Sequence, residues 1–272
     1  MVKLFVVGAG KMGGAIAGGL VSKGVFAAAE VAAFDVNTAA ASDFSRRIGC
    51  AAFDTVEAAK SAFAEAPAIL LAVKPQVLES ALEFWKNAAV SLSQKLVISI
   101  VAGVTIEKLA SLTGGDRIVR VMPNTPALVG AGAAAYAPGP GATAEDAELV
   151  ERILSAVGMA RRMKESDLDA VTALSGSGPA YVFEFIMALA DGGVYEGLPR
   201  DMALELAAQT VFGSAKMVLE STESPAVLRD AVISPAGTTA RGVAKLDEGA
   251  FRSTVVKAVI AASERSAELG KL

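Results

Sequence analysis

The chain has 272 residues, of which 53% are hydrophobic and 20% are charged, so a sizeable core is expected and overall disorder is not. A formal net charge of −4 and an aromatic content of 6% argue against a nucleic-acid-binding surface, which needs clustered cations and stacking side chains. Histidine is absent, which excludes histidine-built zinc sites and Ser-His-Asp hydrolysis, and no metal site is expected.

The sequence gives no indication of secretion or of a membrane span. Cys50 is the single cysteine, so no intramolecular disulfide forms and a reducing, cytoplasmic compartment is expected. Residues 1–8 lack the long apolar region and cleavage site of a signal peptide. No uninterrupted apolar run reaches the roughly 18 residues of a membrane span, so no membrane association is expected.

The first half of the chain alternates strands and helices. Strands are predicted at 2–7, 30–35, 68–73, 96–101 and 117–121, and helices at 14–22, 38–47, 56–64, 76–89 and 105–112. A strand at 131–137, a helix at 143–157 and a short strand at 158–163 follow. This alternation predicts an α/β, Rossmann-like domain over residues 1–163, with a mostly parallel sheet and right-handed crossovers.

The second half reads as helices alone. They are predicted at 167–174, 178–195, 200–220, 225–232, 237–247 and 250–269. Many of their faces carry Ala, Gly and Val, which allow close helix packing. Residues 164–272 are therefore predicted to form an all-α domain.

A glycine motif lies between the first strand and the first helix. In Gly8-x-Gly10-x-x-Gly13, the three glycines allow a tight turn, close approach of a pyrophosphate and close helix–strand packing. This context predicts dinucleotide binding rather than a plain glycine turn. Asp35, at the end of the second strand, favours NAD, whereas Asn37 and Thr38 offer polar groups to a 2′-phosphate or cap the next helix. The choice between NAD and NADP stays open.

Two more strand ends carry candidate residues. Lys74 follows the strand at 68–73 and lies either beside the cofactor or in an exposed turn. Asn124, between Pro123 and Pro126, either holds the nicotinamide side or braces its loop. Ligands of open parallel sheets bind at the carboxyl ends of the strands, which is where both residues are expected.

Two hydroxyl- and glycine-rich runs interrupt the helical half, at 174–181 (Leu-Ser-Gly-Ser-Gly-Pro-Ala-Tyr) and at 234–239 (Ser-Pro-Ala-Gly-Thr-Thr). Such runs weaken helices. Their hydroxyls and bare backbone N–H groups suit a small anion such as a carboxylate. Capping of a helix is the alternative role for Thr238 and Thr239.

These motifs together resemble the pyrroline-5-carboxylate reductase family. The likeness rests on residues 8–13, 72–75, 122–126, 174–181 and, most specifically, 225–247, and it covers nearly the whole chain in order. It implies NAD(P)H-dependent reduction of a cyclic imine to L-proline, with NADP(H) preferred and NAD(H) possible. It also implies that the helical half interlocks with a partner subunit, giving a homodimer or larger homo-oligomer.

The resemblance also assigns site residues. For the cofactor it implies Gly8, Ala9, Gly10, Lys11, Met12, Gly13, Asn37, Ala72, Val73, Lys74, Pro75, Val101, Ala102 and Asn124. For the substrate it implies Glu165, Ser175, Ser177, Gly178, Asp230, Gly237, Thr238 and Thr239, with Ser177 and Thr239 as the catalytic pair. Two positions depart from the family: Ala236 stands where many relatives have Gly, a change expected to be tolerated, and Asp54 stands where relatives often have Asn.

The missing histidine fits this chemistry, because an imine nitrogen is basic and the substrate can arrive already protonated.

Two alternative functions remain. One is another reductase of the same architecture, such as an imine reductase or a 3-hydroxyacid dehydrogenase, although the helix at 181–195 lacks the lysine usual in the latter. The other is a non-catalytic nucleotide sensor, which would not need the two hydroxyl-rich runs.

Overall fold

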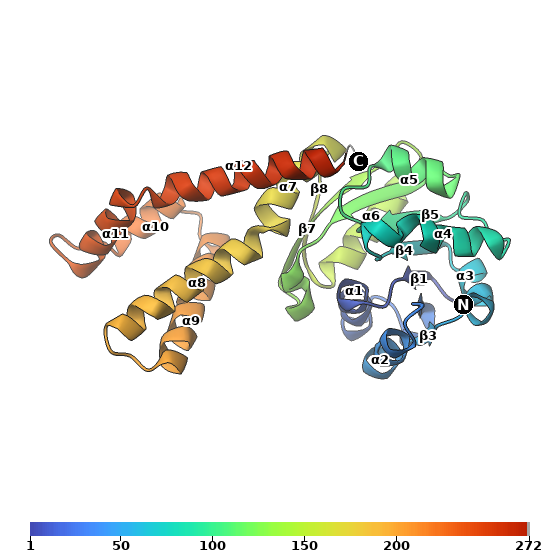
Figure 1. Ribbon diagram of the computed structural model, residues 1–272, viewed down its shortest axis with the longest axis horizontal. Helices are drawn as coiled ribbons and strands as arrows, with labels where there is room; N and C mark the ends of the chain where they lie inside the picture. The colour runs from blue at the N-terminus through green and yellow to red at the C-terminus, as the bar shows by residue number, and fades with distance from the viewer. Residues whose placement is uncertain (271–272) are drawn as a thin grey trace. The chain divides into compact units, whose positions relative to one another are not determined.

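The computed structural model describes residues 1–270 and divides into two compact units (Figure 1). The first unit contains residues 1–176 and the C-terminal segment from Ala262 onward. The second unit contains residues 177–261.

The first unit is built on an eight-stranded sheet. Its order is β3-β2-β1-β4-β5-β6-β7-β8, with β1 to β6 parallel and β7 antiparallel to β6, which confirms the mostly parallel Rossmann-like sheet. The strands are β1 (Leu4–Val7), β2 (Val31–Phe34), β3 (Ala51–Phe53), β4 (Ala68–Leu71), β5 (Leu96–Ser99), β6 (Ile118–Met122), β7 (Gly132–Pro138) and β8 (Gly158–Arg162). Strand β3 was not predicted, because three partly exposed residues at a sheet edge leave no periodic pattern.

Helices cover both faces of this sheet, because side chains of a strand alternate between its faces. In β1, Leu4 and Val6 belong to one buried cluster, and Phe5 and Val7 belong to the other. The first cluster includes side chains of α1 (Lys11–Ser22), α2 (Thr38–Ile48) and α6 (Ala144–Ser155). The second includes side chains of α3 (Val56–Glu65), α4 (Leu78–Asn87) and α5 (Ile106–Thr113). The sheet is therefore closed on both faces, and its free polar surface lies at the strand ends.

The second unit is helical. It contains α8 (Gly178–Tyr195), α9 (Arg200–Glu220), α10 (Pro225–Ala231), α11 (Thr238–Glu248) and most of α12 (Phe251–Leu269). Its own buried cluster is small and consists of Ala190, Ala203 and Ala207. Large apolar side chains such as Phe183 and Phe212 are 58% and 61% exposed. One copy of this unit thus leaves extensive apolar surface uncovered.

The two compact units divide after Gly176, and the domain boundary at residue 163 stays a prediction from the sequence. Helix α7 (Leu168–Val171) and the π-turn that follows it, Thr172–Gly176, belong to the first unit. Leu168 is part of the buried cluster on the α3–α5 face. The end of α12 is tied to α7 by a 2.7 Å hydrogen bond from Ser266 Oγ to Asp169 Oδ1.

Among the residues that the structure describes, one helical stretch, Glu165–Tyr195, is long and apolar enough by length and composition to cross a membrane, although it contains no uninterrupted apolar run of that length. Only 11% of its most apolar window is buried within the chain. Length and composition are weak grounds for a membrane span, because a helix that packs against protein meets the same criteria. Several of its exposed apolar side chains, such as Phe183 and Met187, lie in α8.

We expect Asp146→Asn to destabilise the first unit. Arg117 holds the pKa of Asp146 below its usual range by donating bidentate hydrogen bonds of 2.6 and 2.9 Å, and the Asp146 side chain is 6% exposed. A lowered folded-state pKa means that this stability is present above the unfolded pKa of about 3.9 and is lost as the pH falls below it. The substitution should lower the free energy of unfolding at pH 7 by about 2 kcal/mol and make the acid-induced loss of stability shallower.

Urea titrations from pH 7 to pH 3 measure both effects. The matched control is Asp43→Asn, which breaks a solvent-exposed pair with Arg46 and Arg47 and should change stability little. Equal effects of the two substitutions would contradict the assignment.

Candidate functional site

The carboxyl end of β1 is shaped by three glycines. Gly8 has φ +105°, and a Cβ there would lie 2.6 Å from the carbonyl oxygen of Ala72. A Cβ at Gly13 would lie 2.3 Å from the carbonyl oxygen of Gly8. Nothing lies within 4 Å of a Cβ placed on Gly10. Gly8 and Gly13 are therefore required for packing, whereas Gly10 leaves open space in front of the loop.

The N-terminus of α1 meets this open space. Gly10 is its N-cap residue and has no side chain to accept from the first backbone N–H groups. Lys11 and Lys74 are both exposed, and neither forms an ion pair with another residue in the part of the chain that the structure describes. Unsatisfied N–H groups, the helix dipole and uncompensated lysines together favour a phosphate group.

Asp35 connects the glycine loop to the next helix. Its Oδ2 accepts from the backbone N–H of Ala9 at 2.9 Å, and its Oδ1 accepts from that of Asn37 at 2.9 Å. Asn37 in turn caps α2, because its Oδ1 accepts from the N–H groups of Ala39 and Ala40. The capping role considered for Asn37 is thus observed, and its amide oxygen is already used there.

Two adjacent cavities lie along the carboxyl ends of the strands. The larger, of about 520 Å³, includes Gly8, Gly10 and Asp35 in its lining and is walled by apolar side chains such as Phe84. The smaller, of about 230 Å³, is lined by Met12, Ala72, Val73, Lys74, Ile100, Ala102, Met122 and Pro123. Ala72, Val73 and Lys74 line both. Because they share these residues, the two cavities form one groove, and the glycine loop and the apolar wall both belong to its larger part.

Two residues assigned to the cofactor lie differently. The Val101 side chain is 2% exposed and packs in the core, so only its backbone can face the groove. Pro75 lines a separate cavity of about 680 Å³ with Thr105 and Lys108. Sequence reasoning missed Val36, Val77, Ser80 and Phe84 of the larger groove cavity, because they carry no motif and meet only in the fold.

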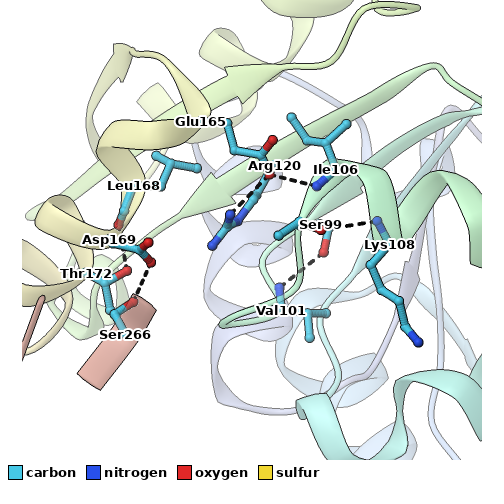
Figure 2. Close-up of polar contacts among 11 residues, drawn as sticks. Ser99, Val101, Ile106, Lys108, Arg120, Glu165, Leu168, Asp169, Thr172 and Ser266 are labelled. Carbon is cyan, nitrogen blue, oxygen red and sulfur yellow. Dashed lines mark hydrogen bonds and ion pairs between the residues drawn. The ribbon is translucent and has the colours of Figure 1, made fainter. Parts of the chain in front are cut away.

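The loop after β5 is held by polar contacts at both ends (Figure 2). At its start, Ser99 Oγ accepts from the N–H of Val101 at 3.3 Å. At its end, Glu165 Oε1 accepts from the N–H of Ile106 at 2.7 Å and from Arg120 Nη1 at 3.1 Å. Arg120 is a strand residue that is only 8% exposed. Glu165, which the resemblance assigns to substrate, is here already engaged by a buried guanidinium and a helix N-terminus.

Asn124 and Ser175 contact each other. Asn124 Nδ2 donates to the backbone oxygen and to Oγ of Ser175 at 3.2 and 3.3 Å. Neither residue is among those lining the two groove cavities. The bracing role considered for Asn124 is the one that the structure shows.

The hydroxyl-rich runs precede two helices of the second unit. Ser177 is the N-cap residue of α8 without a side-chain cap, and Gly178 opens that helix with free space around it. Gly237 is the N-cap residue of α11, so Thr238 and Thr239 lie in its first turn. Because Gly237 has no side chain, the first N–H groups of α11 lack a side-chain cap. The start of α11 therefore presents backbone donors together with the hydroxyls of Thr238 and Thr239. At the start of α8, Pro179 has no N–H and the N–H of Ala180 donates to the carbonyl oxygen of Ser177, so mainly the Ser177 hydroxyl is offered there.

One feature of the second run and one of the helix before it, α10, bear on the assignment. Ala236 has φ +56°, a left-handed conformation in which a Cβ costs on the order of 1 kcal/mol. The Gly-to-Ala change at this position is thus accommodated with strain. Asp230 accepts 2.6 and 2.9 Å hydrogen bonds from Arg229, its neighbour in the chain.

We expect Gly13→Ala to abolish dinucleotide binding. The added Cβ meets the Gly8 carbonyl oxygen, so α1 must shift away from the loop that it positions. Gly18→Ala in the same helix is the matched control, because its Cβ would lie 3.8 Å from the nearest atom, in Ile48. Fluorescence titration with NADPH measures binding; equal affinity of the two variants would refute this account of the glycine loop.

Two family models match successive parts of the chain. Residues 165–269 match the family model described as "Pyrroline-5-carboxylate reductase dimerisation". Residues 3–103 match the model "NADP oxidoreductase coenzyme F420-dependent". The first match covers the helices with the hydroxyl-rich runs, and the second covers the glycine loop and most of the groove.

Similar proteins match over almost the full length. Pyrroline-5-carboxylate reductase of Methanosarcina acetivorans is 46% identical over 99% of this chain and 98% of its own. That of Arabidopsis thaliana is 44% identical over 99% and 96%. The crystal structure of Plasmodium falciparum pyrroline carboxylate reductase with NADP bound has a TM-score of 0.85 at 35% identity, covering 99% of this chain and 98% of that one. The chain belongs to the pyrroline-5-carboxylate reductase family.

Proposed function

We propose that the chain reduces 1-pyrroline-5-carboxylate to L-proline by hydride transfer from NAD(P)H, the last step of proline biosynthesis. The observation that carries this proposal is a dinucleotide-shaped groove in a chain with full-length relatives named pyrroline-5-carboxylate reductase. The single small chamber at the end of the groove, lined by Met12, Met122 and Pro123, fits a nicotinamide-sized ring.

The groove residues divide the work of holding the dinucleotide. Gly10, the start of α1 and Lys74 would hold the phosphates, and Asp35 and Val36 would flank the adenosine ribose. When bound, the nicotinamide supplies the hydride that adds to the C=N carbon. NADPH is the preferred donor in this proposal, supported by the NADP oxidoreductase model and by the NADP in the P. falciparum structure. Asp35 lets NADH serve as well, because an acid at this position suits a ribose 2′-OH.

The helical unit would bind the substrate. The N-terminus of α11 offers backbone N–H groups to the ring carboxylate, and the first turn adds the hydroxyls of Thr238 and Thr239. Ser177 would add a third hydroxyl from the start of α8. Thr239 is placed at the ring nitrogen, where it orients the reacting bond.

Proton balance does not require a side-chain acid. The basic imine nitrogen enters as an iminium, and hydride addition to carbon converts it directly to the amine of proline. This accounts for a reductase without histidine. The chain's task is orientation, exclusion of water and charge complementarity.

Assembly and compartment follow the same proposal. The exposed apolar side chains of α8 and α9 and the match to a dimerisation family support a homodimer or a larger homo-oligomer. A cytoplasmic location suits Cys50, which is 2% exposed and whose thiol pKa is raised by burial. We include neither nucleic acid nor a membrane among the partners.

Turnover tests the proposal directly. The protein is mixed with 1-pyrroline-5-carboxylate and either NADPH or NADH, and loss of the reduced-nicotinamide absorbance is followed together with formation of proline. We expect proline and oxidised nicotinamide in equal amounts, with higher kcat/KM for NADPH. No turnover with either donor would overturn the proposed function. Oxidation of acyclic 3-hydroxyacids by NADP+ or NAD+, without reduction of the imine, would favour the dehydrogenase alternative.

Thr239 provides a residue-level prediction. Thr239→Ala should lower kcat/KM for the imine about tenfold, because one hydrogen bond to the reacting substrate is worth roughly 1.4 kcal/mol. Thr239→Ser keeps the hydroxyl and should retain most of the activity. NADPH affinity should be unchanged in both variants. Unchanged kcat/KM in Thr239→Ala would remove this residue from the reaction.

A further inference from the structure

The contacts between Asn124 and Ser175 belong to a closed network with Ala133. Asn124 Oδ1 accepts from the N–H of Ala133 at 2.8 Å, and Ser175 Oγ donates to the carbonyl oxygen of Ala133 at 3.2 Å. Together with the two bonds from Asn124 to Ser175, these contacts join three chain segments. Asn124 is 9% exposed, so the network is largely shielded from water.

The network replaces backbone hydrogen bonds at the end of the β6–β7 pair. In the antiparallel register of β6 and β7, Met122 lies opposite Ala135, so Asn124 would come opposite Ala133. Strand β6 ends at Met122, and Pro123 has no N–H to continue the ladder. The amide side chain of Asn124 and the hydroxyl of Ser175 instead satisfy the backbone donor and acceptor of Ala133. Buried backbone polar groups rarely lack a hydrogen-bond partner, so losing this network would be energetically costly.

The hydrogen of the Ser175 hydroxyl is committed by this arrangement. A serine hydroxyl has one hydrogen to donate, and here it points to Ala133 O while Oγ accepts from Asn124. The Ser175 hydroxyl therefore has no hydrogen left for a substrate carboxylate. Its assignment as a direct substrate ligand is replaced by a role inside the protein.

The segment held by this network adjoins the nicotinamide end of the groove. Ser175 lies in the π-turn Thr172–Gly176, and such turns recur at functional sites. A Cβ on Gly176 would lie 2.2 Å from Cε of Met122, so this turn packs directly on a side chain that lines the 230 Å³ cavity. Ser177 is the next residue along the chain.

We propose that Asn124 and Ser175 are positioning residues, which together hold the π-turn against Met122 and so fix the wall of the nicotinamide cavity. This inference rests on the proposed function for its catalytic consequence. Asn124 contacts neither substrate nor cofactor in this assignment. It acts through Ser175, and the two should behave as one unit.

A double-mutant cycle with Asn124→Ala and Ser175→Ala tests the unit. Each substitution should lower kcat/KM for the imine by about 10- to 100-fold, since misplacing a binding group by about 1 Å costs that much. The double variant should be no worse than the poorer single variant, and the dissociation constant for NADPH should change less than about twofold. Ser111→Ala, an exposed serine on α5, is the matched control and should match the wild type.

Three outcomes would overturn the inference. In the first, the losses of kcat/KM in the two single variants multiply in the double variant while Ser175→Ala raises only the KM for the imine. That result would make Ser175 a direct substrate ligand. A lowered Tm with unchanged kcat/KM would show a merely structural role. Unchanged values throughout would remove both residues from the site.

Amide hydrogen exchange separates this inference from the proposed function. Exchange at residues 174–178 should rise to a similar extent in both single variants and no further in the double variant, whether or not the protein turns over the imine. If the wild type does not turn over the imine but the variants show this exchange pattern, only the proposed function is refuted. If exchange stays at the wild-type level in both single variants, Asn124 and Ser175 do not hold the π-turn, and the inference is refuted.

Discussion

The contact between Gly13 and the carbonyl of Gly8 is the constraint on which the site depends. It lets α1 start directly over the end of β1, which brings the uncapped N–H groups of the helix to the carboxyl edge of the sheet. The backbone of Ala72, just after the neighbouring strand β4, also packs against Gly8. A groove with phosphate-binding character follows from this packing, because the same backbone atoms that touch one another also leave the open space at Gly10.

The polar residues around this edge fall into two groups. Asp35, Glu165, Asn124 and Ser175 are engaged by other groups of the chain, where they tie loops and helix ends together. Among the residues that the structure describes, Lys74 forms no ion pair, and the starts of α8 and α11 have no side-chain cap. The first group gives the site its shape. The second group is what remains to meet an anionic ligand, and this division is the physical basis of the proposed reaction.

Local patterns in the sequence predicted most of the fold. Strands β1, β2, β4, β5 and β6 are short apolar runs, the helices of both units are readable as helical stretches, and the glycine motif has a backbone requirement that is readable from three residues. Strand β3 was missed because it is short and half-exposed at the edge. The expected boundary at residue 163 came from the last visible strand, whereas α7 and the π-turn pack with the first unit through contacts that no local pattern carries.

Roles of single polar residues were harder to predict. Asn124 meets Ser175 across 51 positions of sequence, and Glu165 meets Ile106 across 59. A motif shows that such residues lie near a site, but the partner of each side chain is decided by the register of β6 and β7 and by the turn after α7. Arg120, the buried partner of Glu165, gave no signal at all because a lone arginine in a strand pattern is usually a surface residue.

The central claim is that the groove at the carboxyl ends of β1, β4 and β5 holds the dinucleotide. Amide hydrogen exchange of the intact protein with and without NADPH tests it most directly, since it locates the ligand without relying on turnover. The account predicts protection at residues 8–14, 72–74 and 100–102, with residues 108–112 beside the separate 680 Å³ cavity unchanged. Protection confined to that separate cavity, or absent from the glycine loop, would contradict it.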